Sequence, residues 1–414
     1  MNALTPEVQA ILAGLDPAST DFTTARTLPA AVYTSEEFYA FEKEAIFARE
    51  WLCLGHIDQV ANPGDFFTIQ VGDEPLIVAR GEDGELRVMS AICQHRGYPI
   101  TVDGEKGTAK QFRCAYHYWA YGLDGQLVAA PEMTQTCPIA ELRAETRLPR
   151  LKVEIWHGMI FANMDPGAEP LAPTLAKLEP EMAAYNVGDL KIVKTMEYKN
   201  QPWNWKGMHE NALEPYHTSF VHMGYHDIAP ASMAEFVEWD DSDGQVMHPT
   251  NYRWIDAGFN PTGRAVLPIL PGLSEQRRTR VMFASVLPTV FFAFTPDQVF
   301  YFLITPETAN TMTLRMGWLF PESSIKAPGF EWAFQMQNDV NEAINEQDIY
   351  SNTRMQQGQR SRYANRGRYS WQEGTLPQMN RWLTLRYMRY AALLDSRYAD
   401  LVADLVDAVG PGTR

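Results

Sequence analysis

The sequence has few cysteines, and it has no long apolar run. Only 4 of its 414 residues are cysteine, which is too few for a disulfide-stapled secreted scaffold. A reducing compartment, most simply the cytoplasm, is therefore expected. No segment approaches the roughly 20 apolar residues that a membrane-spanning helix needs. Residues 1–20 lack the basic start and apolar core of a secretory signal, so none is expected.

Basic residues are also scarce relative to acidic ones. The chain has 35 Lys and Arg against 51 Asp and Glu, a formal net charge of −16. The negative electrostatic potential of such a chain argues against nucleic acid or an anionic membrane as a partner. It is compatible with a cationic small molecule or a basic protein. No Gly-rich loop for phosphates is present. Apolar residues make up 45% of the chain and charged residues 21%, which is the balance of a folded globular protein.

The length and the patterning predict an α+β protein with two domains. Residues 1–47 are expected to form a helical segment that packs on the second domain. Residues 48–160 alternate apolar and polar positions in short runs joined by Gly-Asp and Asp-Gly turns, which predicts a small all-β domain. Residues 161–414 contain alternating runs followed by long helical patterns, which predict a larger domain whose antiparallel sheet is covered by helices.

Two Cys/His pairs lie in aromatic, glycine-containing turns of the predicted β-domain. Cys93 and His95 form the first pair, and Cys114 and His117 form the second. Two thiolates and two imidazoles bind either zinc or a two-iron cluster. Zinc fingers usually separate CxxC from HxxxH, whereas each pair here mixes the two ligand types. This mixture favours a cluster in which one iron takes both cysteines and the other takes both histidines, over a zinc-stapled domain.

A second group of candidate ligands lies between Trp203 and His222, where polar residues sit in a frame of Trp and Tyr. His217 and His222 are five positions apart, and Glu214 lies one helical turn before His217. This spacing predicts two imidazoles and a carboxylate on one side of a slightly irregular helix. On these residues alone, a pair of hydrogen-bonded core histidines is the competing interpretation.

The loops CQHRG and CAYHYW, inside a β-domain, resemble the Rieske [2Fe–2S] motif of the Rieske non-haem iron oxygenases. The likeness extends over nearly the whole chain: leader, Rieske domain and catalytic domain. It implies that Cys93, His95, Cys114 and His117 hold a [2Fe–2S] cluster whose potential lies above that of all-cysteine clusters. Tyr118 is a local departure, because the family commonly has glycine or another small residue there.

The same resemblance implies a mononuclear Fe(II) held by two histidines and one carboxylate, with positions left open for O2. The family motif Asn-x-x-Asp-x-x-His-x4-His maps onto Asn211, Glu214, His217 and His222. Asn211 and Glu214 are then expected to serve catalysis, and the two histidines to bind iron.

The third ligand is expected from a distant helix, in a pattern like Glu-Asp followed by Gln-x-Gly. The match here is EQD and then QQG, so Asp348 is assigned as the ligand, with Glu346 and Glu342 as poorer candidates. Without the resemblance, Asp348 would read as part of a solvated helix face.

Glu214 departs from the family pattern, which usually has Asp. In the family this carboxylate bridges a Rieske histidine of one subunit and an iron-ligand histidine of the next within a trimer. The same arrangement in this chain would place His117 of one subunit opposite Glu214 and His217 of its neighbour, so the resemblance implies a homotrimer. With a glutamate at this position, the sequence resembles the branch of the family that acts on carnitine, betaine and related methylammonium compounds.

The resemblance implies the terminal oxygenase of a system that passes electrons from NAD(P)H through a ferredoxin or a flavin reductase. The expected reaction is O2-dependent hydroxylation of a small organic substrate. Monooxygenation, including N- or O-dealkylation, is favoured over cis-dihydroxylation of an aromatic ring because of Glu214. A Rieske electron carrier and a zinc-stapled binding protein are alternatives from other classes. An apolar, aromatic-walled pocket is expected to hold either an aromatic ring or an N-methyl cation.

Overall fold

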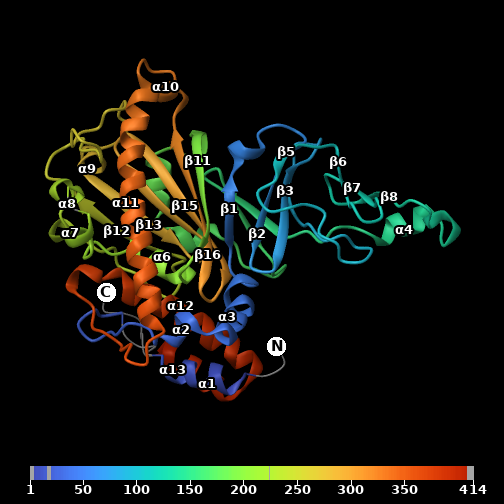
Figure 1. Cartoon of the computed structure of the whole chain (residues 1–414), viewed down its shortest axis with the longest axis horizontal. Coiled ribbons are helices and arrows are strands. Elements are labelled where there is room, and N and C mark those ends of the chain that lie inside the picture. Colours follow the sequence, from blue (N-terminus) through green and yellow to red (C-terminus); the bar gives the residue numbers. More distant parts are fainter. Residues whose placement is uncertain (1–3, 16–19, 223, 408–414) are drawn as a thin grey trace. The chain divides into compact units, whose positions relative to one another are not determined.

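The computed structural model describes residues 4–15, 20–222 and 224–407. They form two compact units (Figure 1): a smaller one at Arg49–Glu169, and a larger one from the described parts of Met1–Ala48 and Pro170–Arg414. None of the helices in these ranges is long and apolar enough to cross a membrane. The α+β class predicted from the sequence is confirmed.

The smaller unit consists of short antiparallel strands in three sheets. The first sheet has the order β1 (Leu52–His56), β10 (Met159–Asn163), β9 (Lys152–Trp156). The second has the order β4 (Leu86–Ser90), β3 (Glu74–Arg80), β2 (Asp65–Val71), β5 (Lys106–Thr108). The third is the meander β6 (Gln111–Arg113), β7 (Ala120–Gly122), β8 (Leu127–Ala129). One α-helix interrupts the strands, α4 (Ile139–Glu145).

This unit continues past residue 160, where the sequence pattern ended the β-domain. Strand β10 runs on to Asn163, whose side-chain amide donates to the carbonyl of Arg49 at 2.9 Å. The indole of Trp51 donates to the carbonyl of Glu169, also at 2.9 Å. These hydrogen bonds close the unit at Glu169, within the Pro-rich segment.

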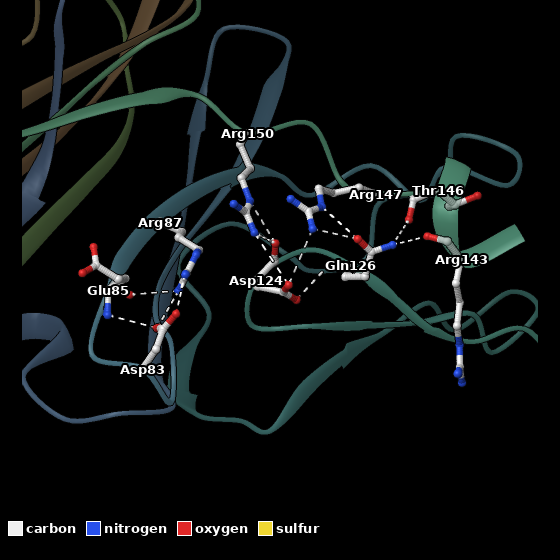
Figure 2. Close-up of polar contacts among 9 residues, drawn as sticks. All are labelled: Asp83, Glu85, Arg87, Asp124, Gln126, Arg143, Thr146, Arg147 and Arg150. Carbon is white, nitrogen blue, oxygen red and sulfur yellow. Dashed lines mark hydrogen bonds and ion pairs between the residues drawn. The ribbon is translucent and has the colours of Figure 1, made fainter. Parts of the chain in front are cut away.

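Figure 2 shows a polar network around the turn between β7 and β8. Arg150 donates through Nε to the carbonyl of Asp124 at 2.9 Å, and Gln126 Nε2 donates to the carbonyl of Thr146 at 3.0 Å. The turn is thereby tied to the segment that follows α4. Strand β7, which carries Tyr121, is held in place from this side.

The larger unit is built on one antiparallel sheet of six strands. Its order is β11 (Lys191–Gln201), β16 (Thr311–Phe320), β15 (Gln298–Thr308), β14 (Val290–Thr295), β13 (Arg280–Val286), β12 (Gln245–Asn251). The alternating runs of the sequence correctly predicted β11 and β13 to β16. Strand β12 was missed because it lies in a loop-rich region and contains Pro249. A proline is tolerated there because β12 is an edge strand.

Long helices pack against this sheet. Helix α11 (Phe330–Gln359) runs across one face (Figure 1), where Phe334 packs edge-on against Phe320 with ring centroids 5.6 Å apart. The periodicity of residues 379–406 predicts a single closing helix, but this is wrong, because two helices form, α12 (Thr375–Leu394) and α13 (Arg397–Asp407). Asp395 takes an extended conformation between them, and its carboxylate accepts the backbone N–H of Arg397.

The N-terminal residues belong to the larger unit. They form α1 (Pro6–Ala13), α2 (Ala31–Thr34), α3 (Glu36–Glu42) and a π-helical turn (Lys43–Phe47). Ser35 caps α3 by accepting the N–H of Phe38, and the Phe38 ring meets Tyr387 of α12 edge-on at 5.0 Å. The remaining short α-helices of the larger unit are α5 (Glu179–Ala184), α6 (Trp205–Ala212), α7 (Thr218–Val221), α8 (Tyr225–Ile228), α9 (Glu275–Arg278) and α10 (Glu322–Ile325). Across both units, 3₁₀ turns form at Ile57–Val60, Met133–Gln135, Ala172–Leu175, Val187–Asp189, Ala231–Met233 and Trp371–Glu373.

A fully buried ion pair joins the N-terminal segment to α6. Lys206 Nζ lies 2.8 Å from Glu42 Oε1, both side chains are 0% exposed, and Tyr387 donates to the same carboxylate. Lys206→Met is expected to lower the free energy of unfolding by about 3–5 kcal/mol, because it leaves the Glu42 charge buried and unpaired. Urea unfolding measures this. The control, Lys206→Met with Glu42→Gln, removes the stranded charge and should recover much of the loss; equal losses in both would contradict the argument.

Candidate metal centres and substrate pocket

The stretch from Trp203 to His222 is not one irregular helix. Helix α6 ends at Ala212, a turn follows, and α7 begins at Thr218. Pro215 explains the break, since it has no N–H to donate and it disfavours the helical conformation of the residue before it. His217 and His222 consequently flank the single turn of α7 instead of sharing the face of a longer helix.

Three candidate ligand atoms nevertheless converge. His222 Nε2 lies 3.0 Å from Asp348 Oδ1, and His217 Nε2 lies 3.1 Å from His222 Nε2 and 3.6 Å from Asp348 Oδ1. Among the described residues, this trio is the group of His, Cys, Asp and Glu side chains arranged closely enough for one metal ion. Asp348 comes from α11, far along the chain from both histidines.

Hydrogen bonds set the protonation of both imidazoles. His217 Nδ1 donates to Glu214 Oε1 at 2.6 Å, and His222 Nδ1 donates to Gln347 Oε1 at 2.7 Å. In the neutral form of both rings the Nε2 atoms are unprotonated, so two lone pairs and a carboxylate oxygen face one another. Ligands about 2.1 Å from a metal and at right angles lie about 3 Å apart, so the three atoms fit one divalent ion.

Further contacts hold these candidate ligands in place. Asn211 Nδ2 donates to Asp348 Oδ1 at 3.1 Å, and the second oxygen of Glu214 accepts the backbone N–H of His217 at 3.0 Å. Burial lowers the pKa of His217, but the Glu214 and Asp348 carboxylates together outweigh burial, and the net pKa is raised. Ligand histidines commonly donate their other nitrogen to such an oxygen, which orients the ring.

The structure separates Asp348 from the other two acidic candidates. Glu346 is exposed, and Glu342 pairs with Lys194 at 3.0 Å. Gln347 is a contact that sequence reasoning missed, because its position beside Asp348 gives no sign that it reaches His222. His209 is fully buried, with Nδ1 2.8 Å from Ser285 Oγ, so it is a structural residue.

The two Cys/His loops of the smaller unit repeat one backbone pattern. The N–H of Cys93 donates to the carbonyl of Tyr98 at 2.9 Å, and the N–H of Cys114 donates to the carbonyl of Trp119 at 2.8 Å. In each loop, the residue four positions after the cysteine donates back to the cysteine carbonyl at 3.0 Å. The loops therefore present their side chains as a matched pair.

Their side chains segregate by ligand type. Cys93 and Cys114 are 2% and 1% exposed, whereas His95 is exposed and His117 is half-buried. The imidazole centroids are 4.7 Å apart, and Tyr121 places its hydroxyl 3.3 Å from Cys93 Sγ. Two buried thiols facing two imidazoles at the surface suit a cluster with one sulfur-bound and one nitrogen-bound iron.

Tyr118 occupies a position that favours glycine. Its φ is 62°, close to the 72° of Gly97 at the equivalent place in the other loop. The family's preference for a small residue has this cause, since a left-handed backbone costs a side-chain-bearing residue more than glycine. The ring points outward, 59% exposed, with the Arg113 guanidinium 5.8 Å from its centroid.

A cavity opens beside the His217, His222 and Asp348 cluster. It encloses about 730 Å3, its open side included. Its walls are mainly apolar and aromatic: Met208, Tyr225, Phe259, Phe283, Phe291, Phe300, Phe302, Met316 and Ile344. An apolar, aromatic-walled cavity with a few polar groups is typical of a site for a small organic molecule.

Both units match known families. Residues 50–150 match the Rieske [2Fe-2S] domain, and residues 187–389 match the ring hydroxylating alpha subunit (catalytic domain). The chain belongs to the Rieske non-haem iron oxygenases. Its Rieske domain and its catalytic domain imply a [2Fe–2S] cluster and a mononuclear iron that works with O2.

Individual relatives point to two kinds of oxygenase. The chain is 34% identical over 203 residues to the carnitine monooxygenase oxygenase subunit of Escherichia coli (strain K12), covering 49% of this chain and 53% of that one. It is 37% identical over 198 residues to the biphenyl 2,3-dioxygenase subunit alpha of Rhodococcus jostii (strain RHA1), covering 47% and 41%. The chain thus spans about half the length of these relatives or less.

The fold is also that of a solved oxygenase. The crystal structure of the quaternary ammonium Rieske monooxygenase CntA, bound to an inhibitor, superposes with a TM-score of 0.74 at 22% identity. The superposition covers 90% of this chain and 99% of that one. At this identity the likeness concerns the fold.

A buried acid near the catalytic site makes stability depend on pH. Burial raises the pKa of Glu210 from 4.5 to about 7, although Tyr33 donates to it at 2.5 Å. An acid whose pKa is raised by folding contributes stability that is fully present below pH 4.5 and is lost as pH rises through about 7. Relative to Glu210→Gln, the wild type should lose up to about 1.4 kcal/mol per pH unit across this window. Urea unfolding at about pH 5 and about pH 8 tests this, and parallel pH profiles would contradict it.

Proposed function

We propose that this chain is the terminal oxygenase of a Rieske system and catalyses reductant- and O2-dependent monooxygenation of a small organic substrate. The observation that carries the proposal is the convergence of His217, His222 and Asp348 beside an apolar cavity, in a chain that also has a complete Cys/His cluster site. A Rieske electron carrier would not need the second metal site. A protein whose zinc ion is purely structural would not need a substrate cavity beside a metal site.

The residues of the chain bind and orient the groups that react. His217, His222 and Asp348 would hold the iron, and Cys93, Cys114, His95 and His117 would hold the cluster. Bound in these places, the iron supplies O2 activation and the cluster supplies electrons. Asn211 and Gln347 fix the ligand geometry, and the aromatic walls exclude water from the cavity.

Electrons are proposed to cross between subunits of a homotrimer, from His117 of one subunit to Glu214 of the next. Exposed aromatic residues beside both groups support this. Tyr116, next to His117, is 53% exposed, and Tyr216, two positions from Glu214, is 42% exposed. Apolar surface of this kind is typical of an interface. The donor is proposed to be a ferredoxin or a flavin reductase supplied by NAD(P)H, in the cytoplasm.

The kind of oxygenation is proposed from Glu214 and the named relatives. Glu214 stands where most of the family has Asp, and the carnitine monooxygenase oxygenase subunits are among the relatives. N- or O-dealkylation through an unstable carbinol is therefore preferred, with cis-dihydroxylation of a ring as the second candidate because of the dioxygenase relatives. Stoichiometric formaldehyde or another aldehyde supports dealkylation, whereas a dihydrodiol without aldehyde supports the alternative.

Metal analysis tests the class of protein. The oxygenase should contain about three irons per chain, two in the cluster and one at the mononuclear site. An EPR spectrum of the reduced protein should show the Rieske cluster. Two irons would indicate a carrier, and zinc without iron would indicate a structural site.

A further inference from the structure

The turn between α6 and α7 carries Glu214, and its internal contacts tie it mainly to α7. Glu214 accepts the backbone N–H of His217 at 3.0 Å and the Nδ1 proton of the same residue at 2.6 Å. Thr218 Oγ1 donates to the carbonyl of Pro215 at 2.7 Å. These contacts do not satisfy the end of α6, where the carbonyls of the last turn have no partner within the helix.

A threonine from another helix supplies such a partner. Thr375, the first residue of α12, donates through Oγ1 to the carbonyl of Leu213 at 2.5 Å. Leu213 is the residue at which α6 ends, and both side chains are 0% exposed. Among the described residues, no other side chain from outside residues 203–222 donates a hydrogen bond to the backbone of residues 213–217. The Thr375 hydroxyl is therefore the polar contact that fixes the backbone of this turn to the rest of the larger unit.

The start of α12 is a firm support for this contact. Gly374 lies so close to the Phe236 ring that a Cβ on this glycine would be 3.0 Å from it. Gln378 Nε2 donates to the carbonyl of Val237 at 3.1 Å. Thr375 lies between these two contacts along the chain, in a segment that is closely packed and does not shift easily. It can therefore hold the turn in place instead of following it.

A neighbouring residue shows that this segment lies beside Glu214. Glu373 precedes the first residue of α12 by two positions, and its carboxylate accepts the backbone N–H of Ser370 at 2.5 Å. Burial raises the pKa of Glu373 to about 7, and the negative charge of Glu214 contributes to this rise. One carboxylate affects the pKa of another in this way only when the two are close. The start of α12 and Glu214 are therefore neighbours in space.

We propose that Thr375 is a positioning residue for electron transfer between the metal centres. Its hydroxyl fixes the carbonyl of Leu213, and through the adjoining peptide it sets where the Glu214 carboxylate lies. Loss of the hydroxyl leaves a buried carbonyl unpaired, which favours a displaced turn in which that carbonyl finds another partner. Thr375 is not one of the residues that line the cavity, so it acts on the link and not on the substrate. This inference rests on the proposed function, since it requires Glu214 to connect the cluster of one subunit with the iron of the next.

The transfer can be measured without O2 and without a substrate. A flash of light on a deazaflavin with a sacrificial electron donor reduces the cluster of an enzyme whose mononuclear iron is ferric. The absorbance of the cluster then recovers as its electron passes to that iron, and EPR follows the loss of the ferric signal. Iron content and the EPR spectrum of the reduced cluster are recorded for each variant.

Thr375→Val keeps the shape of the side chain and removes the hydroxyl. It should slow the recovery at least about tenfold, because a displacement of about 1 Å in a positioned group can cost up to about 100-fold in rate. Iron content and the cluster spectrum should remain those of the wild type. Thr375→Ser restores the hydroxyl and should transfer electrons within about twofold of the wild-type rate. Thr375→Ala, which also lacks the hydroxyl, repeats the test with a smaller side chain.

Thr384→Val is the matched control. Thr384 is a fully buried threonine of the same helix, and its Oγ1 has no hydrogen-bond partner among the described residues. Its removal should leave the transfer rate unchanged. A double variant shows whether Thr375 acts through Glu214: adding Thr375→Val to Glu214→Gln should slow the transfer no further, because two changes that act on one link are not additive.

The outcomes separate this inference from the proposed function. A wild type without mononuclear iron, or one in which the electron never reaches that iron, overturns the proposed function. If the wild type transfers electrons, a wild-type rate in Thr375→Val, or a Thr375→Ser enzyme as slow as Thr375→Val, overturns this inference alone. Effects of Thr375→Val and Glu214→Gln that add in full also overturn it. So does loss of the mononuclear iron in Thr375→Val, which would show that the turn serves to hold His217 as a ligand.

Discussion

Asp348→Ala should lower the iron content from about three to about two per chain and abolish turnover, while the visible spectrum of the Rieske cluster is retained. Asp348 Oδ1 supplies the anionic member of the trio, 3.0 Å from His222 Nε2. Two imidazoles alone leave the charge of Fe(II) uncompensated and provide too few ligands to hold it. Iron quantification, EPR of the reduced cluster and product formation measure the three parts of the prediction.

The matched control lies on the same helix. Glu346→Ala removes an exposed carboxylate close to Asp348 and should leave iron content and turnover unchanged. If Asp348→Ala kept its third iron while Glu346→Ala lost it, the assignment of the ligand would be wrong. A loss of cluster absorbance in Asp348→Ala would mean that the change unfolds the protein, which circular dichroism would show directly.

Glu214→Gln should leave both metal centres loaded and slow the transfer of electrons from the cluster to the iron by at least about 100-fold. The anionic acceptor that binds His217 Nδ1 at 2.6 Å is lost, and with it the proposed link to His117 of the neighbouring subunit. Rapid mixing of the reduced protein with O2 and substrate, followed by the absorbance of the cluster, measures the rate. Iron content serves as the internal check.

A conservative variant distinguishes the effect of the negative charge at position 214 from the effect of side-chain length. Glu214→Asp keeps the anion and shortens the side chain by one methylene, so part of the transfer rate should remain. A Glu214→Gln enzyme that turns over normally would show that the bridge is not needed. A variant that loses the mononuclear iron would show that Glu214 acts by orienting His217 as a ligand, and not in the electron path.

Several features were predictable because the residues that decide them are close together in the chain. The β-hairpin turns, the capped start of α3 and the long helix α11 follow from local patterns. The break between α6 and α7 was also readable in principle, since Pro215 lies in the middle of the predicted helix. It was missed because the spacing of His217 and His222 suggested continuity.

The sequence by itself determined the ligand types, because the Cys/His pairs lie in short loops and His217 and His222 flank a single helical turn. Only the tertiary structure decided which distant groups meet them. Asp348 and Gln347 reach the histidines from α11. Such contacts depend on how a helix packs across a sheet, and no local pattern records that packing.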